Sequence, residues 1–400
     1  MKHPMSRKFT ILIVMYIAVV ATVCGAAQPR FLDNYNIACY TMADGLPCNH
    51  IDDMYRDSKG FLWVAFVGGG LSRFDGYDFV NFDDTSVNRH IKSNFVRAVV
   101  EDSHGRLWVA GEGGVDVIDL STLSVAKIGD TTGKLDSIMV RGVSNLFFDS
   151  HGALWLSGPQ VVDRLAFDED GNVVTLSSVP VPGAFYQGIV VREIGGEVWL
   201  PVGGTVYRAR TGMDGMVRLL PVSSSLSDLP DVGYFSDFVE KDGQVWISTD
   251  HGLYRYDPAS GMIKHYLNDP ADGRSLPQNF LTDIAVTDGN RLVVSTLKGI
   301  CVYNPINDDF ERADDPAHNI NNQFVNMMLV DGEEIFVGTE GGGINVLSPR
   351  RLYMRSMVHN PKDPGSISDN PVNSILETPD GSLGGGTVEG GLNVRRQGGA

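Results

Sequence analysis

Short apolar runs alternate along the chain with turns rich in Gly, Asp and Asn. Residues 50–82 show the pattern clearly: HIDDMYRD, FLWVAF, LSRFD and DFVNF are separated by a D-S-K-G turn, a glycine run and a G-Y turn. Runs of β-branched and aromatic residues between tight turns are typical of antiparallel strands. The pattern predicts one four-stranded antiparallel sheet in these residues.

The same unit recurs at intervals of 43 to 48 residues, giving eight copies. All five tryptophans of the chain occupy one position of the unit, in its second strand, and three later copies carry another residue there. These anchor positions are Trp63, Trp108, Trp155, Trp199 and Trp246, followed by Val293, Phe336 and Gly384. A four-stranded repeat of this length with a recurring aromatic residue indicates a β-propeller. We therefore expect an all-β fold in which the tryptophans are structural and fill the space between blades.

Seven repeats would close one propeller over residues 28–350, and residues 351–400 would form an incomplete first blade of a second propeller. The N-terminal segment FLDNYNIACYT (31–41) is expected to add a strand to the last blade and so cover an exposed edge. An eight-bladed closure of the whole chain is the alternative. The eighth copy has Gly384 at its anchor position and ends in RRQGGA, which we interpret as a truncated gene or a fragment.

Residues 1–27 read as a secretory signal peptide. Lys2, Arg7 and Lys8 precede an apolar run of 15 residues (9–23), and small residues follow it. The run is shorter than the about 20 residues of a membrane-spanning helix. An uncleaved membrane anchor is the alternative, and lipidation at Cys24 is a weaker one. We expect export to the periplasm, with tethering to the inner membrane if the segment is retained.

Composition excludes several classes of function. The formal net charge of −17 and the pI near 4.8 argue against binding of nucleic acid through this region. Beyond Cys24, the three cysteines Cys39, Cys48 and Cys301 are too few for a disulfide scaffold, and a Cys39–Cys48 disulfide and free thiols both remain open. No C-x-x-C occurs, so we expect no metal and no cofactor.

Motifs that resemble catalytic or nucleotide-binding sites have simpler interpretations. GDTTGK (129–134) is one residue short of a phosphate loop and is expected to be a surface loop. DEDGN (168–172) lacks the ligand spacing of a calcium loop and is expected to be a hairpin turn. The acidic residues that recur, such as Asp57, Asp102 and Asp149, lie in turns. No catalytic residue is assigned.

The segments that lead into the first strand of each repeat differ from copy to copy. Propeller topology places them on one face, around the central channel, and they offer aromatic side chains together with Asn, Gln and Arg. This mixture suits an oligosaccharide or another small polar ligand. The alternative is that the aromatic rings pack under the loops and the polar groups cap strands. The candidate ligand-binding residues are His50, Phe95, Arg97, Arg141, Tyr186, Gln187, Tyr234, Asn279 and Gln323.

The repeats resemble the two-component regulator propeller repeat family. DGLPCNHI (44–51), DSKGFLWV (57–64) and GGLSRFDGYDF (69–79) match its pattern, and residues 268–284 and 359–375 resemble its inter-blade linkers. The resemblance covers nearly all of the chain after residue 27. It implies the periplasmic sensor region of a hybrid histidine kinase, which detects glycan breakdown products and controls polysaccharide-utilisation genes. It also implies a homodimer in the full-length protein.

Family members continue into a second propeller, a membrane helix and kinase modules, and we find no kinase module in these 400 residues. Two other functions stay open. An exported propeller glycosidase or lyase needs carboxylates at a fixed separation, which the sequence does not mark. The second of these alternatives to a sensor is a protein-binding scaffold.

Overall fold

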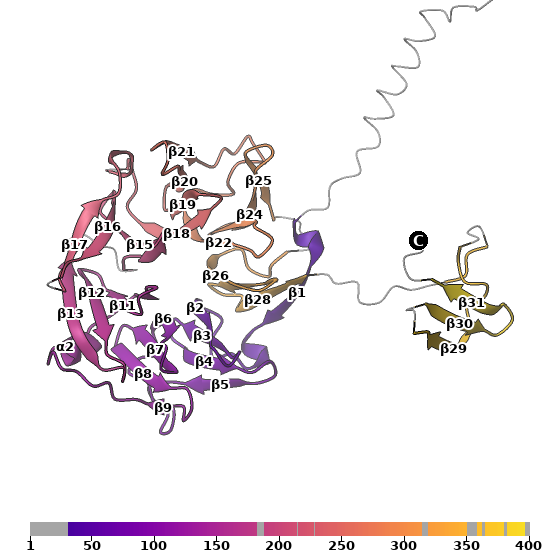
Figure 1. The fold of residues 1–400 in the computed structure, drawn as a ribbon, viewed down its shortest axis with the longest axis horizontal. Helices are drawn as coiled ribbons and strands as arrows, with labels where there is room; N and C mark the ends of the chain where they lie inside the picture. The colour runs from indigo at the N-terminus through magenta and orange to yellow at the C-terminus, as the bar shows by residue number, and fades with distance from the viewer. Residues whose placement is uncertain are drawn as a thin grey trace, which may run out of the picture. The chain divides into compact units, whose positions relative to one another are not determined.

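The computed structural model describes residues 31–181, 188–213, 215–227, 229–313, 319–349, 358–361, 365–379 and 382–396. The chain divides into two compact units, Met1–Pro349 and Arg350–Ala400. In the first unit, seven four-stranded antiparallel sheets are arranged as blades around a common axis (Figure 1). The predicted all-β, seven-bladed propeller is therefore confirmed.

Blades 1 to 4 follow one another in chain order, and within each blade the strands pair in sequence. Blade 1 contains β2 (Ile51–Arg56), β3 (Leu62–Phe66), β4 (Gly70–Phe74) and β5 (Phe79–Phe82). Blade 2 contains β6 (Val96–Glu101), β7 (Arg106–Gly111), β8 (Gly114–Asp119) and β9 (Ser124–Val125). Blade 3 contains β10 (Asn145–Phe148), β11 (Leu154–Ser157), β12 (Val161–Phe167) and β13 (Val173–Pro180). Blade 4 contains β14 (Arg192–Ile194), β15 (Glu197–Val202), β16 (Thr205–Thr211) and β17 (Val217–Pro221).

Blades 5 to 7 complete the ring. Blade 5 contains β18 (Phe235–Lys241), β19 (Gln244–Thr249), β20 (Gly252–Tyr256) and β21 (Ile263–Tyr266). Blade 6 contains β22 (Leu281–Val286), β23 (Leu292–Thr296), β24 (Gly299–Asn304) and β25 (Asp309–Arg312). Blade 7 contains β26 (Val325–Asp331), β27 (Glu334–Thr339), β28 (Ile344–Pro349) and the N-terminal strand β1 (Tyr35–Tyr40). The described residues also contain four short helices: η1 (Phe31–Asn34) precedes β1, and η2 (Met42–Asp44), α2 (Leu135–Met139) and η3 (Ser224–Leu226) lie between strands.

The ring is closed by the N-terminal strand. β1 pairs antiparallel with β28, in a register that runs from Tyr35 opposite Pro349 to Tyr40 opposite Ile344. The first strands of blades 1 and 7, β2 and β26, are also in contact. The expected addition of the N-terminal segment to the last blade is confirmed, and closure uses seven blades rather than eight.

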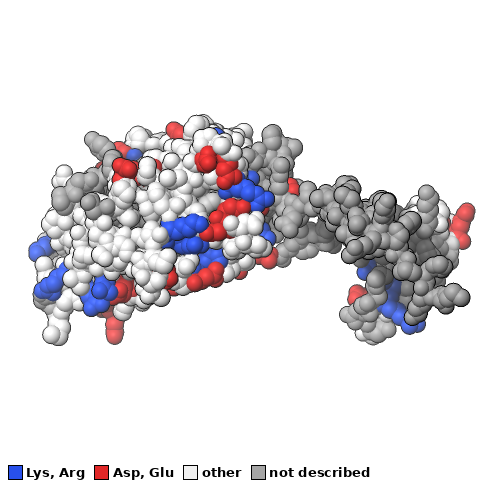
Figure 2. All heavy atoms as spheres, turned by 90° about the horizontal axis from the view of Figure 1, so that it is seen from above, with Lys and Arg blue, Asp and Glu red and all other residues white. Residues whose placement is uncertain are grey.

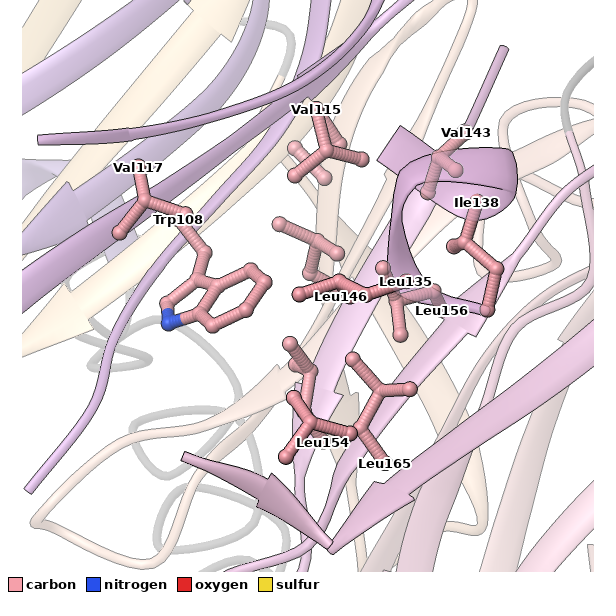
Figure 3. Close-up of a cluster of buried hydrophobic side chains, with 13 residues drawn as sticks. Trp108, Val115, Val117, Leu135, Ile138, Val143, Leu146, Leu154, Leu156 and Leu165 are labelled. Carbon is pink, nitrogen blue, oxygen red and sulfur yellow. The ribbon is translucent and has the colours of Figure 1, made fainter. Parts of the chain in front are cut away.

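The anchor residues pack each blade against the next one. Trp108 of blade 2 lies in one buried cluster with Leu146, Leu154 and Leu165 of blade 3 (Figure 3). Trp63 joins a cluster of blade 2 residues in the same way, and Phe336 of blade 7 joins a cluster with blade 1. A four-stranded sheet cannot bury both of its faces alone, so these inter-blade clusters are the hydrophobic core.

The first unit contains a helix that the sequence did not predict, and it decides the state of the cysteines, which the sequence left open. The short helix α2 precedes blade 3, and its Leu135 and Ile138 are buried in the cluster of Trp108. Cys39, Cys48 and Cys301 are free thiols, so the disulfide alternative is not realised.

The outer wall of the first unit carries mixed charge. Lys and Arg side chains lie interspersed with Asp and Glu on the face shown in Figure 2, and much of the remaining surface is uncharged. In the part of the chain that the structure describes, no helix is long and apolar enough to span a membrane. The expected signal peptide, residues 1–27, lies outside the described residues.

The second unit contains a three-stranded antiparallel sheet of β29 (Val372–Glu377), β30 (Leu383–Thr387) and β31 (Gly391–Arg395). Gly384 stands opposite Leu376 and Val394, both of which are exposed. Leu392 is exposed as well, whereas Leu71, its counterpart in blade 1, is fully buried.

Candidate functional site

A β-bulge recurs at the start of the innermost strand in five blades. The pairing register shifts within the first three residues of β2, β6, β18, β22 and β26. A bulge leaves one residue unpaired and redirects its side chain. The extra residues are Asp52, Arg97, Ser236, Thr282 and Asn326.

An aromatic side chain immediately precedes each of these five strands. Two of them are strongly exposed, with 43% of Phe95 and 51% of Phe324 accessible to solvent, and the other three are half-buried. The rings of Tyr234 and Phe280, on neighbouring blades, stack with centroids 6.4 Å apart. We call this set the rim aromatics: His50, Phe95, Tyr234, Phe280 and Phe324.

Four charged side chains, in addition to the bulge residues Asp52 and Arg97, lie close together near the rim aromatics. Asp53 of blade 1 and Arg192 of blade 4 each shift the pKa of the other, although two blades separate them on the shorter way around the ring. Asp52 of blade 1 likewise affects the pKa of Tyr234 in blade 5. Interactions between non-adjacent blades require these groups to face the propeller axis. We call the set the axial ring: Asp52, Asp53, Arg97, Arg192, Asp237 and Asp283.

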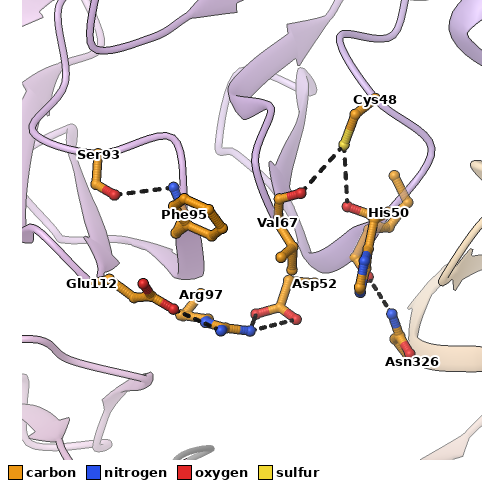
Figure 4. A network of polar contacts seen from close by, with 10 residues as sticks. Cys48, His50, Asp52, Val67, Ser93, Phe95, Arg97, Glu112 and Asn326 are labelled. Atoms are coloured by element: carbon orange, nitrogen blue, oxygen red, sulfur yellow. Dashed lines mark hydrogen bonds and ion pairs between the residues drawn. The ribbon is translucent and has the colours of Figure 1, made fainter.

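Arg97 joins blades 1 and 2 at this ring. Its Nη1 lies 3.3 Å from Asp52 Oδ2, and its Nη2 donates a hydrogen bond of 2.9 Å to Glu112 Oε1 (Figure 4). Burial raises the pKa of Asp52, and the Arg97 guanidinium partly offsets that effect. The guanidinium is therefore held by two carboxylates.

Arg192 joins blades 4 and 5 in a similar way. Its Nε lies 2.8 Å from Asp237 Oδ1 in an ion pair, and its Nη2 donates a hydrogen bond of 3.0 Å to Asp237 Oδ2. Burial disfavours the charged guanidinium, but the carboxylates of Asp237 and Asp283 outweigh it and raise the pKa of Arg192. The two-pronged geometry fixes the guanidinium plane.

Asp53 and Asp283 are held by backbone N–H groups, and no cation in the described part of the chain pairs with either of them. Asp53 accepts from Met54 of its own strand and from Val99 of blade 2, at 2.9 and 2.8 Å. Asp283 accepts in the same manner from Ile284 and from Met328 of blade 7, at 2.7 and 2.6 Å.

Burial dominates the titration of these two carboxyl groups. It raises the pKa of Asp53 to about 7, against the lowering effect of the two N–H donors. The pKa of Asp283 is raised well above its usual range by burial and by the neighbouring Asp237 carboxylate. Ionisation of either group therefore has a cost in free energy.

The structure brings together some of the residues predicted from sequence and separates others. His50, Phe95 and Tyr234 are rim aromatics, and Arg97 belongs to the axial ring. Arg141 lies in the segment before blade 3 and pairs with Asp163 of β12. Tyr186 and Gln187 lie outside the described residues.

Asn279 and Gln323 have a clear structural role. The carbonyl oxygens of both accept a hydrogen bond from a glycine N–H in the preceding blade, Gly252 and Gly299. The side-chain oxygen of Asn279 also accepts from Asn268 N at 2.6 Å, which holds the inter-blade linker. Their contribution to ligand binding stays a prediction.

Sequence reasoning missed the acidic half of the axial ring. It assigned the recurring acidic residues to turns, but Asp53, Asp237 and Asp283 occupy one position of the repeat, the third residue of the first strand. The recurrence of Asp at this position of the repeat was the sequence signal that could have identified these residues. Among the described residues, no group of three His, Cys, Asp or Glu side chains is arranged to hold a metal ion.

The fold and this site define a seven-bladed β-propeller with aromatic groups at the rim and charged groups on the axis. The family model for the two component regulator propeller matches residues 45–68 and 90–113. The repeats of blades 1 and 2 therefore resemble the repeat of this family. None of the curated proteins matches the sequence of this chain.

Solved structures similar to this chain include extracellular domains of bacterial signalling proteins. That of BT3049 from B. thetaiotaomicron, a candidate hybrid two-component system, is 21% identical with a TM-score of 0.61, over 91% of this chain and 48% of the other. That of BT4673, a candidate one-component system of the same organism, is 17% identical with a TM-score of 0.59, over 92% and 48%. The chain thus spans about half the length of these structures.

An enzyme shares the architecture as well. Virginiamycin B lyase from Staphylococcus aureus is 13% identical with a TM-score of 0.56, over 78% of this chain and 99% of the lyase. At these identities the likeness establishes the fold alone.

Proposed function

We propose that this propeller is the extracytoplasmic ligand-sensing region of a two-component signalling system. It recognises glycan-derived oligosaccharides and thereby controls polysaccharide-utilisation genes. The match of two repeats to the two component regulator propeller and the likeness to extracellular domains of signalling proteins support the sensor role. Export by the N-terminal segment and a homodimer of the full-length protein are parts of the same proposal.

One observation carries the choice of ligand class: exposed aromatic rings surround a polar axis. Phe95 and Phe324 offer flat apolar faces to solvent, and such faces pack against the C–H surface of a sugar ring. The axial ring behind them offers carboxylate oxygens that accept hydrogen bonds from sugar hydroxyls. An apolar surface with a few convergent polar groups is typical of a small-ligand site.

Thermal stabilisation of the whole chain by defined oligosaccharides tests the proposal. Cello-, xylo-, manno- and malto-oligosaccharides are added to the wild type and to Phe95→Ala and Arg97→Ala. We expect at least one sugar to raise the melting temperature of the wild type, and the two variants to lose about tenfold or more in affinity.

Tyr77→Ala is the matched control, because Tyr77 is 90% exposed on the turn before β5 and is not a rim aromatic. Loss of binding in Tyr77→Ala as large as in Phe95→Ala would contradict a rim site.

A propeller enzyme is the second candidate, favoured by the shared architecture of the lyase. Incubation of the same sugars with the protein, followed by product analysis, separates the two functions. Stabilisation without fragments supports sensing, and released fragments support an enzyme. A scaffold for another protein is the outcome if no sugar stabilises the chain.

A further inference from the structure

The axial ring has an excess of hydrogen-bond acceptors over donors. Four carboxylates face two guanidinium groups, which leaves two negative charges on the ring when all groups are ionised. Arg97 and Arg192 are already engaged by Asp52, Glu112 and Asp237. Neither guanidinium group is free to pair with a ligand, so a ligand at the axis would have to supply hydrogen-bond donors.

Blade 3 gives independent evidence that the axis lacks hydrogen-bond donors. Asn145 opens β10, and the register against the tryptophan strand places it at the position of Asp53 in blade 1. Its side-chain oxygen is buried and has no hydrogen-bond partner among the described residues. A buried acceptor without a donor is unfavourable, and a donor supplied by a ligand would remove that cost.

The turns behind the rim aromatics extend the negative charge to the surface. Glu112, Asp250 and Glu340 each donate a backbone N–H to the carbonyl of a rim aromatic, at 3.1, 3.0 and 2.9 Å. Three of the five rim positions are therefore joined to an acidic residue. In blade 6 the corresponding turn carries Lys298, whose positive charge offsets only part of the negative charge of the three acidic residues.

We propose that the axial ring selects its ligand by charge: it takes a neutral or amino sugar and rejects a uronic or sulfated one. This inference rests on the proposed function and names the substrate class of the same site. Hydroxyl and ammonium groups supply the missing donors. A carboxylate or sulfate would find both guanidinium groups already engaged, and Asp53 and Asp283, where ionised, would repel it in a poorly solvated region, where repulsion is strong.

Three disaccharides of similar size and different charge test the inference: the β-1,4 disaccharide of glucosamine, cellobiose and digalacturonate. Titration calorimetry of the whole chain at pH 7 is expected to rank affinity in that order, with digalacturonate at least about tenfold weaker than cellobiose.

Asp53→Asn and Asp283→Asn each remove a carboxyl group that can ionise while keeping side-chain size. Each is expected to reduce the preference for the glucosamine disaccharide over digalacturonate by about tenfold. Asp116→Asn is the control, because Asp116 is a buried carboxylate on the third strand of blade 2, paired with Lys92 rather than facing the axis. Circular dichroism and unliganded melting establish that each variant is folded, and one folded axial variant suffices.

The outcomes are distinct. Equal or tighter binding of digalacturonate overturns selection by charge while the sensing function stands. An unchanged preference in a folded axial variant overturns the role of the axial ring. Failure of all three sugars to bind overturns the proposed function together with this inference.

Discussion

The indole N–H of Trp63 donates a hydrogen bond of 2.8 Å to Asp57 Oδ2, and both side chains are buried. The other oxygen of Asp57 accepts from the backbone N–H groups of Lys59 and Phe61, so one carboxylate shapes the turn and satisfies the anchor. The pairs Asp102–Trp108 and Asp149–Trp155 repeat this contact at 2.9 Å. The D-S-x-G turn and the tryptophan six residues later are thus one structural device.

Substitution of Asp57 tests this device. Asp57→Ala leaves a buried indole N–H without a partner and removes two turn contacts, so we expect the free energy of unfolding to fall by about 2–4 kcal/mol. Urea unfolding measures it. Asp75→Ala is the control, because Asp75 accepts from Tyr77 and Asp78 in an exposed turn and holds no indole. Equal losses in the two variants would contradict a role for the indole contact.

The glycine run after Trp63 offers a matched pair of substitutions. Gly70 has φ +75°, and a Cβ there would lie 2.2 Å from the carbonyl oxygen of Phe82. Gly68 has φ +92° and open space around it. We expect Gly68→Ala to cost about 1–2 kcal/mol from backbone strain alone, and Gly70→Ala to cost clearly more because the clash is with backbone. Denaturant unfolding that ranks the two in the opposite order would refute this explanation.

Removal of the N-terminal strand is expected to open the ring. A chain that starts at residue 42 lacks β1 and exposes the edge of β28, whereas a chain that starts at residue 31 keeps it. We expect a loss on the order of 5 kcal/mol, from about 1 kcal/mol for each strand hydrogen bond. Thermal and chemical unfolding of the two chains measures the difference. Equal stability would show that β1 does not close the ring.

Asp53 is expected to make stability depend on pH. Its pKa rises from 3.8 to about 7 on folding, so between pH 4 and pH 7 the folded chain holds a proton that the unfolded chain has released. The contribution of Asp53 to stability is therefore fully present below pH 4 and falls as pH rises to 7, by at most about 1.4 kcal/mol per pH unit.

Asp53→Asn removes this component. Urea unfolding at pH 5 and pH 7.5 should show a smaller loss of stability in the variant than in the wild type, because all other groups are common to both. A wild type that gains stability relative to the variant over this interval would contradict the raised pKa.

The local sequence pattern was sufficient to predict the strands of the blades and the packing between them. The alternation of apolar strands and Gly-rich turns, with Trp63 and its counterparts at one position, predicted four strands per blade and packing between blades. These features depend on contacts within one repeat and its neighbour, which a periodic sequence records. The helix α2 was missed because its five residues are too few to show helical periodicity, and its place is set by burial of Leu135 and Ile138.

The sequence alone established the repeat and the closing strand, because strand pairing and turn chemistry are encoded over short distances. The convergence of Asp53, Arg192, Asp237 and Asp283 was decided only by the tertiary structure. These residues are up to 230 positions apart, and they meet because seven blades turn their first strands toward one axis. Burial at that axis, rather than residue type, raises the pKa of Asp53 and Asp283 and turns ordinary strand residues into a charged ring.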